Sequence, residues 1–256
     1  MGMRASNLFG SAGGFWRAAR SGIGDLLWPP LCSVCGESVI DAADGMCRVC
    51  WDEVMACAVG DYCRRCGKDV SRYAVIDGKC GICSGVDFAF DGLARAGVYR
   101  DALRKLIQGF KFNDRSELAG LLGQMADSAF QGSDFYDQVD MFVPVPLHWR
   151  RRLRRGYNQA YLLTKQLNHP TATICTDLVR IRNTHRQWGL EPAKRRRNVK
   201  GAFGVRRRHN FSGKKVCLVD DISTSWATLN ECAKTLKLAG AEKVFAVVVS
   251  VAMQKR

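Results

Sequence analysis

The spacing of hydrophobic and polar residues divides the chain into three segments. Residues 1–31 contain a short amphipathic stretch around Leu26 and Trp28, which two prolines end. Residues 32–87 hold too few large apolar residues to close a hydrophobic core by themselves. Residues 88–256 carry regular apolar patterns, and we expect this segment to form the main domain.

Within the third segment, helical and β-type patterns alternate. Apolar residues at helical spacing predict helices over 97–112, 117–130, 157–167 and 227–240. Runs of β-branched residues predict strands over 139–146, 171–175, 214–221 and 243–252. Continuous apolar strands separated by helices are typical of a parallel sheet that is covered on both faces. We therefore predict an α/β fold with a parallel sheet and flanking helices.

Eight of the 12 cysteines form four Cys-x2-Cys pairs, which are Cys32/Cys35, Cys47/Cys50, Cys63/Cys66 and Cys80/Cys83. Two thiolates of one pair can bind the same metal ion, and a second pair completes a tetrahedron. Eight ligands with no open position predict two structural zinc ions, whose binding would stabilise a segment without a core. Sequential pairing into two ribbons is favoured, although interleaved pairing fits the same spacing. Disulfides and an iron–sulfur cluster are the less favoured alternatives.

Positive charge is concentrated in one part of the chain. Residues 148–215 contain 19 Lys and Arg against two acids, whereas the whole chain has a net charge of +15. Such a local excess predicts a polyanionic partner, and interleaved aromatics such as Trp149 and Tyr161 suit single-stranded nucleic acid. One small phosphate ligand needs only about three or four cations, so the surplus favours a longer polyanion.

A second informative pattern follows the strand predicted over 214–221. That strand ends at Asp220 and Asp221, and a hydroxyl-rich turn and a helix come next. Hydroxyl groups and the N–H groups at the start of a helix can bind phosphate oxygens. The two carboxylates can hold ribose hydroxyls or a Mg²⁺ ion on a pyrophosphate. The pattern therefore predicts a sugar-phosphate site at the carboxyl end of a central strand.

This pattern resembles a known motif. The segment "VCLVDDISTSWAT" resembles the phosphoribosyl pyrophosphate (PRPP) motif of type I phosphoribosyltransferases. Over nearly its whole length the chain is similar to the ComF family, through "LLWPPLCSVCG", "VYRDALRKLIQGFKF", "VPVPLHWRRRLRRGYNQA" and "RIRNTHRQWGLEPAKRRRNVKGAF". The resemblance implies an N-terminal tail over 1–31, a double zinc ribbon over 32–87 and a type I phosphoribosyltransferase-like domain over 88–256.

The resemblance also implies roles for individual residues. Asp220 and Asp221 would bind the ribose hydroxyls of PRPP, together with Mg²⁺. A cradle for the 5′-phosphate would be formed by Thr224, Ser225, Ala227 and Thr228. The turn after Pro144–Pro146 and the arginines over 150–155 would face pyrophosphate. A mobile hood would carry Arg182, Thr184, Gln187 and Arg195, of which Arg182 and Arg195 would act in catalysis with the two aspartates.

One residue departs from the family pattern. Trp226 stands where the family's phosphate loop normally carries glycine, which tolerates a positive φ and lets the backbone approach a phosphate. The tryptophan either points outward from an unstrained backbone or crowds the phosphate. This departure makes transferase activity a weaker expectation than PRPP binding.

The resemblance implies a function in natural competence. The ComF family is associated with single-stranded DNA during natural transformation, so DNA, PRPP and a competence helicase are the partners we expect. A PRPP-dependent transferase and a non-catalytic DNA-binding factor are the two leading hypotheses, and a protein-interaction scaffold is the least favoured. The chain has no run of 18 apolar residues and no apolar core of a secretory signal, so we expect a cytoplasmic protein without a membrane span.

Overall fold

The computed structural model describes residues 30–39, 45–112, 115–184 and 192–253. The chain forms two compact units, Met1–Asp52 and Glu53–Arg256. The division falls between the two halves of the cysteine-rich segment, so the second ribbon belongs to the same compact unit as the main domain. The boundaries expected at 31/32 and 87/88 stay predictions.

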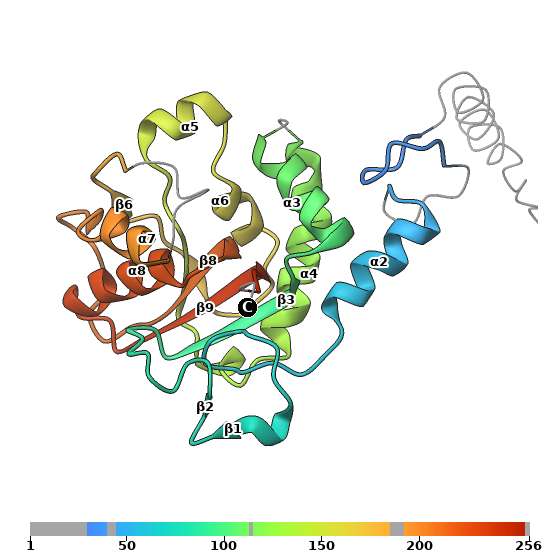
Figure 1. Cartoon of the computed structure of the whole chain (residues 1–256). Coiled ribbons are helices and arrows are strands. Elements are labelled where there is room, and N and C mark those ends of the chain that lie inside the picture. Colours follow the sequence, from blue (N-terminus) through green and yellow to red (C-terminus); the bar gives the residue numbers. More distant parts are fainter. Residues whose placement is uncertain (1–29, 40–44, 113–114, 185–191, 254–256) are drawn as a thin grey trace, which may run out of the picture. The chain divides into compact units, whose positions relative to one another are not determined.

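A five-stranded parallel sheet forms the centre of the second unit (Figure 1). Its strands follow the order β3 (Gly92–Val98), β9 (Lys243–Val251), β8 (Lys215–Ser223), β4 (Met141–Pro144) and β5 (Thr173–Ile174). Every neighbouring pair runs parallel. The middle strands β8 and β9 are mostly buried, which explains why apolar residues such as those of 216–219 and 244–249 follow one another without alternation.

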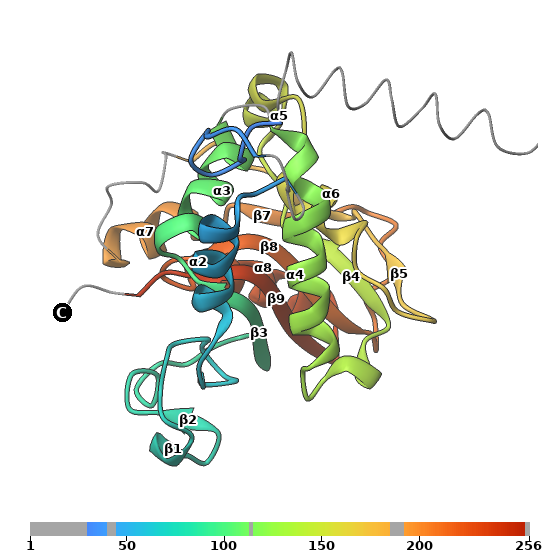
Figure 2. The ribbon, with the colours of Figure 1, turned by 90° about the vertical axis from the view of Figure 1, so that its right-hand side faces the viewer.

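Helices cover both faces of this sheet. On one face α4 (Ala119–Gln131) and α6 (Gln159–Thr164) pack against the strands, with α3 (Asp101–Phe112) beside them. On the other face α8 (Ala227–Leu238) packs against β8 and β9, with α7 (Pro192–Val199) beside it. Figure 2, which looks onto α4, shows the sheet behind this helix and α8 behind the sheet. The predicted α/β fold class is confirmed.

The remaining elements are short. They are α2 (Arg48–Ala58), η1 (Arg72–Ala74), the antiparallel pair β1 (Val75–Ile76) and β2 (Lys79–Cys80), η2 (Ser116–Leu118), η3 (Tyr136–Gln138), α5 (Trp149–Arg155), and the antiparallel pair β6 (Leu178–Arg180) and β7 (Phe203–Val205). Among the described residues, no helix has the length and hydrophobicity needed to cross a bilayer.

The strand β3 was not predicted, and the prediction of a helix from residue 97 was wrong at its start. Residues 97 and 98 belong to β3, and α3 begins only at Asp101. The sequence of β3, "GLARAGV", is poor in β-branched residues, so its pattern gives little sign of a strand. It is the edge strand of the described sheet, next to β9, and Arg95 within it is buried in an ion pair with Asp69.

Candidate functional site

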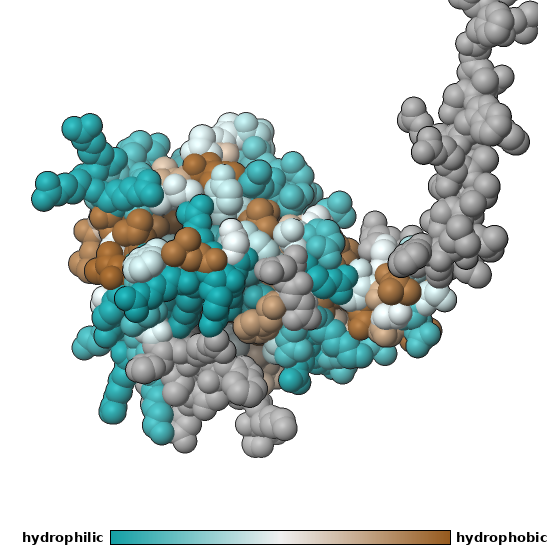
Figure 3. Space-filling model, turned by 90° about the horizontal axis from the view of Figure 1, so that it is seen from above, coloured by the Kyte–Doolittle hydropathy of each residue, from teal (hydrophilic) through white to brown (hydrophobic). Residues whose placement is uncertain are grey.

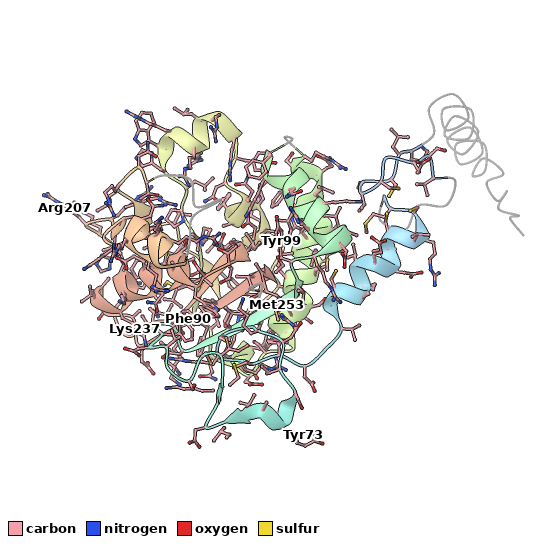
Figure 4. The ribbon with its side chains drawn as sticks, in the orientation of Figure 1. Tyr73, Phe90, Tyr99, Arg207, Lys237 and Met253 are labelled. Carbon is pink, nitrogen blue, oxygen red and sulfur yellow. The ribbon has the colours of Figure 1, made fainter. Side chains whose placement is uncertain are left out.

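A cavity of about 510 Å³ lies at the carboxyl end of β8. Asp220 and Asp221 line it from the strand, Thr224 lines it from the following loop, and Thr228 from the first turn of α8. The other lining residues are Tyr99, Arg104, Gln108, Lys111, Phe112, Val145, Pro146, Leu147, Arg151, Arg154, Arg155, Asn158, Gln159, Ala160, Arg180, Arg195 and Ile222. The cavity thus joins two carboxylates, two threonines and a set of cations. Figure 4 shows Tyr99 where β3 leads into α3.

The two carboxylates have different surroundings. Asp221 is only 5% exposed, and its Oδ1 lies 2.7 Å from the Nζ of Lys111 on α3. The Oδ1 of Asp220 accepts a hydrogen bond of 2.9 Å from the backbone N–H of Asp221. Loss of hydration and the nearby Asp221 carboxylate raise the pKa of Asp220 from its ordinary 3.8 to about 7, against the opposing effect of Lys111. Such a pair of oxygen donors fits Mg²⁺ or the hydroxyls of a ribose.

The loop between β8 and α8 places only some of its predicted ligands on the cavity. Thr224 and Thr228 line it, whereas Ser225 and Ala227 are buried and do not. The hydroxyl of Ser225 has no hydrogen-bond partner among the described residues. Any contribution of Ser225 and Ala227 to a phosphate site would have to come from their backbone N–H groups, next to the start of α8.

Arginines reach the cavity from several elements. Arg151, Arg154 and Arg155 come from α5 and Arg195 comes from α7, whereas Arg150 and Arg152 of the run over 150–155 do not line this cavity. Arg182 does not line the cavity. Its exposed side chain donates hydrogen bonds to the carbonyls of Asn198 and Lys200. Of the other predicted hood residues, Thr184 is buried and Gln187 lies outside the described residues.

Arg180 is a cavity residue that the sequence interpretation missed, as it also missed Arg104 of α3. Arg180 lies at the end of β6, lines the cavity and stands 5.2 Å from the ring centroid of Phe203. Its Nη2 donates to the hydroxyl of Thr184 at 2.5 Å, but its buried Nε has no hydrogen-bond partner among the described residues. Loss of hydration lowers the pKa of Arg180. A partly buried guanidinium with a buried, unused donor is well suited to an anionic ligand.

A second cavity of about 530 Å³ adjoins the first, and Pro146, Leu147, Asn158 and Arg180 line both. It also contains two exposed aromatic side chains, Trp149 at 59% and Tyr161 at 40%, together with Arg152 and Arg206. Figure 3, seen from the side of α5, shows a largely hydrophilic surface with separate hydrophobic patches. Exposed aromatic rings beside arginines can stack on nucleobases and attract phosphates.

Trp226 follows neither of the two sequence alternatives in full. Its backbone is left-handed, with φ 57° and ψ −7°, which costs a bulky residue about 1–2 kcal/mol. Its side chain does not line the cavity. The indole Nε1 instead donates a hydrogen bond of 2.7 Å to the carbonyl of Cys66 in the second ribbon. The ring thus does not crowd the cavity, but the backbone that carries it is left-handed rather than unstrained.

The cysteines form two clusters, Cys32, Cys35, Cys47 and Cys50 in one, and Cys63, Cys66, Cys80 and Cys83 in the other. In each cluster all four sulfur atoms lie within 4.8 Å of one another, which confirms the sequential pairing. A tetrahedron with Zn–S bonds of about 2.3 Å has sulfur atoms about 3.8 Å apart. The distances Cys63–Cys83 of 3.8 Å and Cys66–Cys80 of 3.7 Å match this value. Both clusters therefore fit structural zinc.

The parallel sheet, the acid pair at its carboxyl edge and the two four-cysteine clusters define a zinc-ribbon α/β protein. The double zinc ribbon domain family matches residues 23–84. Competence protein F of Haemophilus influenzae is 32% identical over 219 residues, which is 83% of this chain and 93% of that protein. The chain belongs to the competence protein F (ComF) family, as its sequence motifs indicated.

Two further proteins are similar to this chain. The DNA utilization protein YhgH of Salmonella typhimurium is 31% identical over 84% of this chain and 94% of its own length. Among solved structures, glutamine phosphoribosylpyrophosphate amidotransferase from B. subtilis is similar over 55% of this chain and 30% of that enzyme, with 18% identity and a TM-score of 0.35.

Proposed function

We propose that the chain binds PRPP with Mg²⁺ in the cavity at the carboxyl end of β8 and acts on single-stranded DNA in natural competence. The observation that carries this proposal is the meeting of Asp220, Asp221, Thr224 and Thr228 with several arginines in one cavity. A sugar that bears phosphates at both ends needs carboxylates for its hydroxyls and separate cationic groups for its phosphates. The names of two relatives, competence protein F and DNA utilization protein YhgH, support a role in competence and in the use of DNA.

Each group in the cavity has a proposed task. Asp220 and Asp221 hold the ribose hydroxyls, while Thr224, Thr228 and the N–H groups of Ser225 and Ala227 hold the 5′-phosphate. On the opposite side, the cations that line the cavity hold the pyrophosphate. We assign Arg180 to this group with Arg151, Arg154, Arg155 and Arg195. The catalytic role of Arg182 stays a prediction, since its side chain does not line the cavity.

The same arrangement suits loss of pyrophosphate from ribose C1. Positive charge develops on the sugar as the leaving group departs, so carboxylates near the ribose and cations at the pyrophosphate stabilise the transition state. Bound Mg²⁺ would neutralise part of the pyrophosphate charge. Arg195 on α7 and Arg180 on β6 both line the cavity. Their side chains would therefore also help to exclude water from a bound ligand.

A thermal-shift measurement tests PRPP binding. PRPP with Mg²⁺ should raise the melting temperature of the full chain, and Asp221→Asn should abolish the rise. Asp137→Asn removes an exposed carboxylate that does not line the cavity, and it should keep the rise. No shift in the parent protein at millimolar PRPP would remove the ligand proposal.

A second function, DNA binding without transfer, is favoured by the second cavity and by the 19 Lys and Arg over 148–215. PRPP consumption should be measured with and without single-stranded DNA. Consumption that DNA stimulates would favour the transferase, whereas DNA binding without any consumption would favour the non-catalytic factor. A competence helicase as protein partner stays a prediction.

A further inference from the structure

The second ribbon is tightly packed against the main sheet. The backbone N–H of Leu93 in β3 donates a hydrogen bond of 2.7 Å to the carbonyl of Arg64, which lies within the Cys63–Cys66 knuckle. Gly67 follows with φ +76°, and a Cβ at this position would lie 2.6 Å from Leu93 and 2.8 Å from Val251. Only glycine fits both this φ and this space. The knuckle backbone is therefore held by the sheet on one side.

Zinc bound to the cysteine side chains would also fix the backbone of the Cys63–Cys66 knuckle. Cys66 is completely buried, and its sulfur lies 3.7 Å from that of Cys80, the spacing that fits a shared zinc ion. The carbonyl of this same residue accepts the hydrogen bond from the Trp226 indole. The position of that carbonyl thus depends directly on a zinc-ligand residue.

The indole ring has further partners at the ribbon. The ring of Phe88 meets it edge-on, with centroids 5.3 Å apart, and the Lys68 ammonium lies 5.2 Å from its centroid. Lys68 is almost completely buried and donates to the carbonyl of Ala252, just after β9. Aromatic and cation–π contacts in such buried surroundings orient the indole ring.

The backbone of Trp226 belongs to the phosphate loop. Trp226 lies two residues after Thr224 and two residues before Thr228, both of which line the cavity. Its carbonyl accepts a hydrogen bond of 2.8 Å from Asn230, which begins the hydrogen bonding of α8. A left-handed tryptophan persists only where its surroundings enforce that conformation, and the contacts of the indole with the ribbon provide such enforcement.

We propose that Trp226 is a positioning residue through which the zinc-bound second ribbon holds the phosphate loop in its ligand-binding conformation. None of the cysteine ligands of the ribbon lines the cavity. The ribbon would therefore act on the phosphate loop through the hydrogen bond between the Trp226 indole and the Cys66 carbonyl. Zinc at the second ribbon and the ligand in the cavity should then strengthen each other's binding by the same factor. The last statement rests on the proposed PRPP function, but the control of the loop by the ribbon does not.

Hydrogen exchange on the full chain tests that control without any ligand. Cys80→Ser with Cys83→Ser removes half of the second zinc site, and Cys47→Ser with Cys50→Ser removes half of the first. We expect faster amide exchange over residues 222–228 in the second-ribbon variant alone. Equal exchange over 222–228 in the second-ribbon variant and the parent would overturn the proposal.

Variants of Trp226 test the link itself while leaving the cysteines intact. Trp226→Phe keeps an aromatic side chain but loses the N–H donor. The variant should still bind two zinc ions, while amide exchange over residues 222–228 becomes faster. Affinity for PRPP with Mg²⁺, measured by calorimetry, should fall about fivefold or more. Trp51→Phe, at a tryptophan of α2 that lines neither cavity, is the matched control and should change neither quantity.

Trp226→Gly gives the sharpest result. Glycine adopts the left-handed conformation without help, so the loop no longer needs the ribbon. PRPP affinity in this variant should become independent of the Cys80→Ser and Cys83→Ser changes, whereas in the parent it should fall with them. Equal zinc dependence in both backgrounds would contradict the proposal. If the parent binds no PRPP at all, the proposed function fails, and hydrogen exchange still decides the role of Trp226.

Discussion

The Lys111 ammonium lies 2.7 Å from the Asp221 carboxylate, so α3 and β8 are joined by an ion pair within the candidate site. Both side chains are mostly shielded, with 17% and 8% of their surfaces exposed. Lys111 neutralises the Asp221 carboxylate, whereas Asp220 has to find a cation or hydroxyl partner on the ligand. The pKa of Asp220 is raised chiefly because this carboxyl loses its hydration, and in second place because it lies beside the Asp221 carboxylate, whereas Lys111 opposes the rise.

Removal of Lys111 should destabilise the protein. Lys111→Met leaves the Asp221 carboxylate without its cation, which should cost about 2 kcal/mol, less than for fully buried pairs because Lys111 keeps some exposure. Chemical denaturation measures this loss. The exposed pair Arg115–Glu117 provides the control, and Arg115→Gln should cost less than about 0.5 kcal/mol. Adding Asp221→Asn to Lys111→Met should recover part of the loss, and a purely additive further loss would contradict the pairing.

Binding of PRPP with Mg²⁺ should strengthen with pH up to about 7. Asp220 is protonated below its raised pKa of about 7, and a carboxylate must lose its proton before it can bind a cation. Because the folded state binds this proton more tightly than the unfolded state, the same group also lowers ligand-free stability as pH rises from about 4 to 7. Calorimetry between pH 6 and pH 8 measures the binding. In Asp220→Asn, the pH dependence of the affinity should come only from the titration of PRPP itself. The same pH dependence in this variant and in the parent protein would exclude the proposed role of Asp220.

Arg180→Met should weaken PRPP binding about tenfold or more, because a hydrogen bond to a charged group is worth about 1.5–3 kcal/mol. Arg207→Met makes the same change of net charge at an arginine that points outward in Figure 4, and it should leave PRPP affinity within about twofold. Calorimetry on both variants makes the comparison. Equal losses would show that the binding depends on overall charge alone.

Trp149→Ala should weaken binding of a single-stranded oligonucleotide by about 1–3 kcal/mol, the value of one base stacked on an aromatic ring. Tyr73→Ala removes another aromatic, 89% exposed and located at the tip of the second ribbon in Figure 4, and should have little effect. Fluorescence anisotropy at several salt concentrations gives both affinity and salt slope. A flat salt response in the parent would count against a nucleic-acid partner.

Metal analysis should give two zinc ions per chain, one for each cluster of four cysteines. A chelator should remove them and lower the melting temperature, because zinc binding supplies folding free energy that a ribbon without a core lacks. A content of one zinc ion per chain would mean that one of the two cysteine clusters does not bind zinc.

Patterns that lie within one stretch of sequence were predicted well. The four cysteine pairs, the buried strands β8 and β9 and the acid pair at the end of β8 all follow from local spacing. Arg180 could not be distinguished from Arg182, since both stand in one basic run and only packing places the first against Phe203 at the cavity.

The sequence by itself determined the α/β architecture, the two zinc clusters and the position of the acid pair, because periodicity and ligand spacing act over a few residues. The tertiary structure alone decided which cations reach the cavity and where the Trp226 indole goes. That indole meets a carbonyl 160 residues away in the chain. Contacts of this kind arise from how the ribbon packs on the sheet, and no local pattern encodes the partner.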